Sequence, residues 1–197
     1  MTTTETKAID AAAALRAIAA ARGDAVVLTT MMVSRGWGGV STRPELDLPL
    51  GGAMGKLSSV GLGIALARPE RKVIVLDGDG SLLMSLGSLV TIGGMAPRNL
   101  LHVVCQNSVY EVTGGQPIPG VERLDFGQIA LGAGFRRAET LDDLAALERS
   151  LPELLAADGP TFVTLKLRPF SWGDGPRRRT LDAVKELTEA LGQQSTR

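Results

Sequence analysis

Two short polar segments each follow an apolar run that is typical of a buried strand: Gly78-Asp79-Gly80-Ser81 and Gln106-Asn107-Ser108. Asp79 offers a carboxylate oxygen, Asn107 offers an amide oxygen, and a backbone carbonyl of the second segment can supply a third ligand. Oxygen ligands of this kind suit Mg²⁺, which takes its remaining ligands from phosphate and water. The two segments therefore predict a magnesium site that also binds a phosphate.

The residues around Asp79 are suited to a phosphate group. Gly78 and Gly80 would let the backbone approach a phosphate closely, and Ser81 could donate to a phosphate oxygen beside the amides of the following helix. Taken alone, Gly-Asp-Gly is better explained by an ordinary turn between a strand and a helix, with a helix N-cap. The second polar segment favours the site, because loops at the carboxyl ends of parallel strands project towards the same place.

With Asp79 and Asn107 at this spacing, the sequence resembles the diphosphate-binding domain of thiamine-diphosphate-dependent enzymes. The resemblance implies thiamine diphosphate and Mg²⁺ as cofactors, with Asp79, Asn107 and the Val109 carbonyl as metal ligands. Gln106 stands where the family usually has an Asn, but that residue is not a ligand in the family. The cofactor contacts that the resemblance implies in these two segments are Gly78, Asp79, Gly80, Ser81, Asn107, Val109 and Tyr110.

A glycine-rich segment further upstream, Gly51-Gly52-Ala53-Met54-Gly55, is similar to the family segment that holds the aminopyrimidine ring. The resemblance implies that the Gly52 carbonyl accepts from the 4′-amino group, with Ala53 beside it. Met54 would lie between the two rings of the cofactor and hold its bent conformation. The alternative for Met54 is that it simply fills a gap in the core.

Within the family, the resemblance is closest to the β subunit of sulfopyruvate decarboxylase and the matching half of phosphonopyruvate decarboxylase. It rests on the segments 78–94 and 109–116, and the Thr-Gly-Gly-Gln end of the second is its more diagnostic part. The implied activity is that of a carboxy-lyase for a small 2-oxo acid. Glu111 and Thr113 would face the substrate. An ionised Glu111 that pointed inward would repel a sulfonate or phosphonate, so either Glu111 turns away or the substrate is less anionic.

Family members also need a Glu on a separate pyrimidine-binding domain, which protonates the cofactor. No such domain fits before the first expected strand, so we expect no certain catalytic residue in this chain. The activating Glu would come from a pyrimidine-binding α-type subunit in a hetero-oligomer. Two alternatives stay open: an acetolactate-synthase-like carboligase subunit, and a non-catalytic cofactor-binding or regulatory subunit.

Composition agrees with a folded enzyme subunit. The chain has 197 residues, 44% of them hydrophobic, and a formal net charge of zero. The neutral charge and an aromatic content of only 4% argue against nucleic-acid or membrane partners. A single cysteine, Cys105, is expected to be a small buried residue, and a reducing cytoplasm fits it. No signal peptide or membrane span is recognisable.

Helical and strand-forming segments alternate along the chain, which predicts a single α/β domain whose parallel sheet has helices on both faces. Expected strands cover residues 25–30, 73–76, 100–105 and 161–167. Expected helices cover residues 4–22, 56–67, 82–93, 129–133, 141–157 and 181–191. We expect one thiamine-diphosphate-binding domain over residues 1–197, in which 170–197 is a C-terminal extension.

Two segments rich in glycine and proline, 31–55 and 106–127, are expected to be long irregular loops, and these are usually functional. Exposed apolar residues in 31–55 and 106–120 would mark the interface with the partner subunit. These residues are Met31, Met32, Val33, Trp37, Val40, Val109, Tyr110, Val112 and Ile118. The segment 34–37 could instead cover the cofactor. His102 is expected to be packed rather than catalytic, and Arg177–Arg179 to be a solvated turn.

Overall fold

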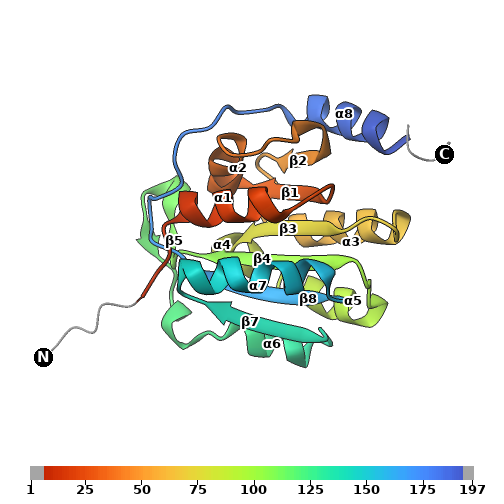
Figure 1. The fold of residues 1–197 in the computed structure, drawn as a ribbon. Coiled ribbons are helices and arrows are strands. Elements are labelled where there is room, and N and C mark those ends of the chain that lie inside the picture. The colour runs from red at the N-terminus through yellow and green to blue at the C-terminus, as the bar shows by residue number, and fades with distance from the viewer. Residues whose placement is uncertain (1–6, 193–197) are drawn as a thin grey trace, which may run out of the picture.

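Within residues 7–192, which the computed structural model describes, six parallel strands form one sheet in the order β2-β1-β3-β4-β8-β7 (Figure 1). The strands are β1 Val26–Thr30, β2 Asp47–Leu50, β3 Val73–Gly78, β4 Leu100–Gln106, β7 Arg137–Leu141 and β8 Thr161–Lys166. The central strands β1, β3, β4 and β8 are apolar and buried over most of their length, as expected for strands covered on both faces. The predicted α/β class with a parallel sheet is confirmed.

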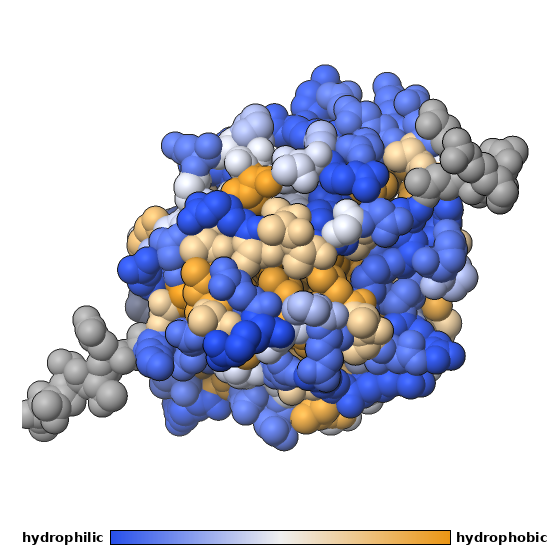
Figure 2. All heavy atoms as spheres, in the orientation of Figure 1, coloured by the Kyte–Doolittle hydropathy of each residue, from blue (hydrophilic) through white to orange (hydrophobic). Residues whose placement is uncertain are grey.

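Helices cover both faces of this sheet. They are α1 Ala11–Ala21, α2 Met31–Gly38, α3 Leu57–Ala67, α4 Asp79–Leu83, α5 Ser88–Met95, α6 Phe126–Gly132, α7 Leu144–Ala156 and α8 Thr180–Gly192. One core layer joins α1, α2 and α7 to the sheet, and the other joins α3, α5, α6 and α8 to its opposite face. In Figure 2, apolar side chains form a band across the α1–α7 face, with hydrophilic surface around it.

The predicted helix 4–22 begins later than expected. Residues 4–6 lie outside the described residues, and α1 starts at Ala11 because Asp10 caps it, accepting a hydrogen bond from the Ala13 amide at 3.0 Å. Such a cap satisfies a free amide of the first turn and sets the start of a helix. The same device starts α7 at Leu144, where Asp143 accepts from the Ala146 amide at 2.9 Å.

The prediction of a long loop over residues 31–55 is wrong. Helix α2 follows β1 without a break, and a 3-10 turn, η1 Pro44–Leu46, leads into the edge strand β2. Glycines at 36 and 38 lowered the helix propensity of α2, but packing requires a small residue there. A Cβ added at Gly36 would lie 2.8 Å from the Trp172 carbonyl oxygen. Pro49 is tolerated in β2 because this strand pairs only with β1.

Three further parts of the chain differ from the sequence-based expectation. The predicted helix 82–93 is two helices, since α4 begins at Asp79 and ends before α5 begins at Ser88. Strand β7 was missed because its residues are only partly buried at the edge of the sheet. The expected loop 106–127 contains a hairpin, β5 Val109–Tyr110 with β6 Gln116–Pro117, and the 3-10 turns η2 Glu111–Thr113 and η3 Val121–Arg123.

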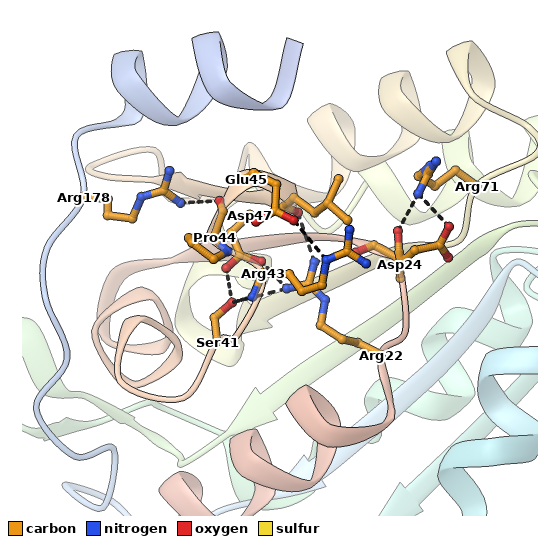
Figure 3. A network of polar contacts seen from close by, with 11 residues as sticks. Arg22, Asp24, Ser41, Arg43, Pro44, Glu45, Asp47, Arg71 and Arg178 are labelled. Carbon is orange, nitrogen blue, oxygen red and sulfur yellow. Dashed lines mark hydrogen bonds and ion pairs between the residues drawn. The ribbon is translucent and has the colours of Figure 1, made fainter. Parts of the chain in front are cut away.

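A buried ion pair joins the end of α1 to strand β2 (Figure 3). The Arg22 guanidinium donates to the Asp47 carboxylate and to the carbonyl of Leu46, and both charged side chains are almost fully buried. Ser41 donates to the same carboxylate, and the Arg22 guanidinium also lies 5.5 Å from the Trp37 ring centroid. Several residues of the segment 31–55, which was predicted to be a loop, therefore belong to the core.

Candidate functional site

The candidate site lies where the order of the sheet changes direction. From β1 the chain goes to β2 on one side and then returns past β1 to β3 on the other side. In open α/β sheets, ligands bind at the carboxyl ends of the strands beside such a switch point. The two polar segments of the sequence leave β3 and β4, which are neighbours in the sheet, so they lie next to each other as expected.

Asp79 is the buried anion of this site. Asp79 is only 3% exposed, and it begins α4 directly after β3. One carboxylate oxygen accepts from the Gly80 amide at 2.8 Å, and the other accepts from the Ser108 amide at 2.7 Å. Burial raises the pKa of Asp79 to about 6, although these amide hydrogen bonds act in the opposite direction.

Asn107 and Val109 lie on the second loop, directly beside Asp79. The Asn107 amide oxygen accepts from the Val109 amide at 3.2 Å, and Ser108 between them has a positive φ of 66°. This conformation is unfavourable for a residue with a side chain, and the hydrogen bond from Ser108 to Asp79 holds it. Gln106 is turned away, because its amide oxygen accepts from the Lys166 ammonium at 2.6 Å.

The two glycines beside Asp79, Gly78 and Gly80, lack a side chain for different structural reasons. A Cβ added at Gly78 would meet nothing closer than the Ser81 Cβ at 4.0 Å, so the Gly78 backbone is open to an approaching group. A Cβ added at Gly80 would lie 2.7 Å from the Tyr110 ring, so this glycine makes room for that ring. Ser81 accepts from the Gly55 amide at 3.1 Å, which leaves its hydroxyl hydrogen free to donate.

One pocket brings together most of the predicted site residues. Met54, Gly78, Asp79, Gly80, Ser81, Asn107, Val109, Tyr110, Glu111 and Thr113 all line it. Gly52 and Ala53 do not line it, although they directly precede Met54 in the chain. Gly52 has a φ of 67°, which is the backbone conformation that favours glycine in this turn.

The donor atoms and charges of the pocket fit Mg²⁺ together with a diphosphate. Among the described residues that line it, the charged side chains are the carboxylates of Asp79 and Glu111, without a lysine or arginine. A diphosphate beside Asp79 would be repelled unless a cation lay between the two anions. One carboxylate, one amide oxygen and a backbone carbonyl are donors that suit Mg²⁺.

The two residues expected to face the substrate are engaged in contacts within the protein. The Glu111 carboxylate accepts from the Phe170 amide and from the Trp172 indole nitrogen, each at 2.5 Å. Glu111 lines the pocket, and both oxygens of its carboxylate are held there by these two donors. The Thr113 hydroxyl lies 3.1 Å from the Gln116 amide oxygen and 3.3 Å from the Tyr110 carbonyl.

The expectation of exposed apolar loops is wrong for three of its residues. Val33 and Trp37 are buried in the core layer of α1 and α2, and Ile118, directly after β6, is buried as well. Trp37 is therefore neither a cover for the cofactor nor a partner contact. Val112 is 57% exposed, as expected. The remaining residues, Met31, Met32, Val40, Val109 and Tyr110, are half-buried.

The reading of His102 and Cys105 as packed residues is confirmed. His102 is fully buried in β4, with its ring 5.2 Å from that of Phe162 in an edge-on arrangement. Its ring nitrogens find no hydrogen-bond partner among the described residues, and one lies 3.9 Å from the buried carboxylate of Asp77. Burial raises the pKa of the Cys105 thiol, which therefore stays protonated.

Several residues of the pocket were not predicted from the sequence. They are Thr30, Met31, Met32, Val33, Cys105, Val112 and Trp172. Thr30 ends β1 and residues 31–33 follow it directly, so the rule that placed the other two loops could have placed them as well. Met31 has a φ of 50°, a strain that is typical of functional sites. Nothing in the local sequence points to Trp172.

The fold is that of an α/β domain with a parallel sheet and a pocket at the carboxyl ends of its strands, and comparison with known proteins identifies its family. Residues 26–165 match the family described as thiamine pyrophosphate enzyme, C-terminal TPP binding domain. The match spans more than half of the chain, which therefore belongs to this family. Among the described residues there is no helix that is both long enough and apolar enough to span a membrane.

Similar proteins confirm the predicted branch of the family. The chain is 44% identical over 150 residues to phosphonopyruvate decarboxylase from Streptomyces viridochromogenes. The aligned region covers 76% of this chain and 37% of that protein. It is 43% identical over 118 residues to sulfopyruvate decarboxylase subunit beta from Methanothermobacter thermautotrophicus. This aligned region covers 60% of this chain and 60% of that protein. The chain thus spans less than two thirds of the length of both relatives.

A solved structure shows the same fold. A proposed thiamin-diphosphate-dependent enzyme from Mycobacterium smegmatis matches with a TM-score of 0.69 and 26% sequence identity. The match covers 82% of this chain and 32% of that chain. The described domain therefore corresponds to about one third of that longer chain.

Proposed function

We propose that this chain is the diphosphate-binding, β-type subunit of a thiamine-diphosphate- and Mg²⁺-dependent decarboxylase for a small 2-oxo acid. A pyrimidine-binding partner subunit would complete the active site, so that the working enzyme is a hetero-oligomer. The observation that carries the proposal is the position of Asp79 and Asn107, side by side at the ends of β3 and β4 in one pocket.

The chain's own residues have separate roles in this proposal. Asp79, Asn107 and the Val109 carbonyl would hold Mg²⁺, and the open backbone at Gly78 would let the diphosphate approach. The Ser81 hydroxyl would donate to the diphosphate while its oxygen still accepts from Gly55. Met54 would hold the bent cofactor, with the Gly52 carbonyl and Ala53 near the aminopyrimidine. The cofactor, when bound, supplies the electron sink that decarboxylation requires.

The charges of the pocket support a partner subunit. A 2-oxo acid is an anion, and a sulfonate or phosphonate would add further negative charge. The lining residues that the structure describes carry carboxylates but no cationic side chain. Groups that attract the substrate, and the Glu that protonates the cofactor, would therefore come from the partner. One similar protein is itself named a subunit beta, which supports this arrangement.

The contacts of Glu111 bear on which substrates the pocket could accept. A carboxylate that pointed into the pocket would repel a second acidic group on the substrate. In the structure this carboxylate is instead occupied by two donors from residues 170 and 172. Because the carboxylate still lines the pocket, sulfopyruvate or phosphonopyruvate would need cationic groups from the partner to offset its charge.

The test is to co-express the chain with a candidate pyrimidine-binding subunit and to supply sulfopyruvate, phosphonopyruvate and pyruvate with thiamine diphosphate and Mg²⁺. Release of CO₂ with formation of the matching aldehyde is the expected result. Formation of an acetolactate-like condensation product would instead indicate a carboligase. A complex that binds the cofactor but releases no CO₂ from any of these acids would contradict the proposed activity.

A further inference from the structure

The segment between β8 and α8, residues 168–179, crosses the carboxyl edge of the sheet, and we call it the C-terminal strap. In Figure 1 it is the blue coil that passes the hairpin of β5 and runs beyond α2 to α8. The family match ends at residue 165, so the strap lies outside the part of the chain shared with the family. Directly after the strap, the Thr180 hydroxyl of α8 donates to the Pro49 carbonyl of β2 at 2.8 Å.

One acidic side chain contacts the strap beside the pocket, in addition to contacts elsewhere such as the Ala11 amide donating to the Ser171 hydroxyl at 2.9 Å. The Glu111 carboxylate uses one oxygen for the Phe170 amide and the other for the Trp172 indole N–H. Hydrogen bonds to an ionised acceptor are roughly twice as strong as those between neutral groups. Glu111 lies on the loop that also carries Asn107 and Val109, so the strap and the proposed metal loop are directly connected.

The conformation of the strap fits this attachment closely. Phe170 has a φ of 57°, a left-handed conformation that is unfavourable for an aromatic residue. Its ring lies over Gly115, where an added Cβ would be only 2.7 Å from the Phe170 ring. Phe170 is nevertheless 69% exposed, so burial of the ring does not explain the strained backbone. The hydrogen bond that the Phe170 amide donates to Glu111 explains this backbone conformation instead.

Trp172 connects the attachment to the pocket itself. It is 4% exposed and lines the same pocket as Asp79. Its backbone carbonyl lies against Gly36, where an added Cβ would be 2.8 Å away. The backbone of Trp172 therefore packs against α2, while its indole N–H donates to the Glu111 carboxylate.

We infer that Glu111 is a positioning residue, which seats the strap so that Trp172 forms a wall of the cofactor pocket and the loop 107–113 is held ready for Mg²⁺ and diphosphate. The inference rests on the proposed function for the identity of the ligand. The attachment itself rests only on contacts within this chain. It gives the C-terminal extension a direct part in cofactor binding.

The test compares Glu111→Gln with wild type in the full chain, labelled with ¹⁵N. The chain has two tryptophans, so only two indole N–H signals are expected, and Trp172→Phe assigns them. In Glu111→Gln the amide oxygen can accept only one of the two donors, and its NH₂ group faces the other. One of the two N–H groups, the Trp172 indole or the Phe170 amide, should therefore exchange with water about tenfold faster, while the Trp37 indole stays unchanged.

The second readout is the affinity for thiamine diphosphate with Mg²⁺, measured by calorimetry. Glu111→Gln should raise the Kd about tenfold, with a melting temperature close to that of wild type. Trp172→Phe keeps an aromatic ring in the pocket wall and leaves the Phe170 contact intact, so it should weaken binding less. Glu122→Gln is the matched control, because that exposed carboxylate contacts only the neighbouring Arg123 among the described residues.

Each outcome decides a different point. Unchanged exchange of both the Trp172 indole and the Phe170 amide in Glu111→Gln would overturn the attachment. Faster exchange with an unchanged Kd would overturn the positioning role. If the wild-type chain bound no thiamine diphosphate, with or without its partner, the proposed function would fail, and the exchange comparison would still decide whether Glu111 seats the strap.

Discussion

The Asp79 carboxylate accepts a hydrogen bond from the Ser108 backbone amide at 2.7 Å, and this contact joins the loops that follow β3 and β4. Ser108 has a left-handed backbone, which turns its N–H towards Asp79. The donors proposed for Mg²⁺ therefore lie on two loops that are already connected. A buried anion held in this way is well placed to bind a cation, because its orientation does not have to change.

Replacing Asp79 tests the metal site most directly. Asp79→Ala should abolish Mg²⁺-dependent binding of thiamine diphosphate, because the diphosphate would lose the cation that links it to the protein. Calorimetry on the chain, alone and with its partner, measures the change. The control is Asp142→Asn, which removes an exposed carboxylate that does not line the pocket. Unchanged affinity in Asp79→Ala would show that the site is assigned to the wrong residues.

The affinity for Mg²⁺ should depend on pH through Asp79. Burial raises the pKa of this carboxyl group to about 6, and Mg²⁺ binds only the ionised form. Below pH 6 the affinity should therefore fall, by about tenfold per pH unit. Titrations between pH 5 and pH 8 measure this, and an affinity that stays constant across the range would contradict the shifted pKa.

Without Mg²⁺, the same group should affect stability in the opposite direction. Its folded-state pKa is raised above the ordinary value of 3.8, so the folded state binds the proton more tightly than the unfolded state. The stabilising contribution is complete below pH 3.8 and is lost as the pH rises through about 6. Urea unfolding of wild type and Asp79→Asn at several pH values isolates this contribution, because the Asn variant should lack it.

The buried pair of Arg22 and Asp47 should be important for stability. Arg22→Ala leaves the Asp47 carboxylate buried without its cation and should lower the free energy of unfolding by about 3–5 kcal/mol. Replacing both residues, as in Arg22→Met with Asp47→Leu, should cost much less. The control is Arg98→Ala, which breaks an exposed pair with Asp158 and should change stability little. Urea unfolding measures all three, and equal losses for Arg22→Ala and Arg98→Ala would contradict the prediction.

The chain purified alone should bind the cofactor weakly and show no decarboxylase activity. Co-expression with a pyrimidine-binding subunit should produce a stable complex on size-exclusion chromatography and CO₂ release from the substrate. The physical reason is that the proposed activating Glu and the cationic groups for the substrate come from the partner. A turnover of about 1 s⁻¹ or more by the isolated chain, a normal rate for an enzyme, would refute the split site.

By itself, the sequence determined the α/β class, the central strands and the place of Asp79 and Asn107. Continuous apolar runs identify buried parallel strands, and the loops after neighbouring strands meet at one edge whatever the remaining detail. It also predicted most residues of the pocket. It was wrong about residues 31–55, where the glycines of α2 and Pro49 of β2 are typical of a loop when the sequence is considered alone.

Only the tertiary structure decided which residues complete the pocket and where Glu111 points. The two donors to Glu111 lie 59 and 61 positions further along the chain, and no local pattern of residue types predicts a contact over that distance. The same holds for Gly36, whose lack of a side chain makes room for Trp172. Such contacts depend on the path of the strap across the sheet edge, which is set by packing against α2 and the hairpin rather than by local preference.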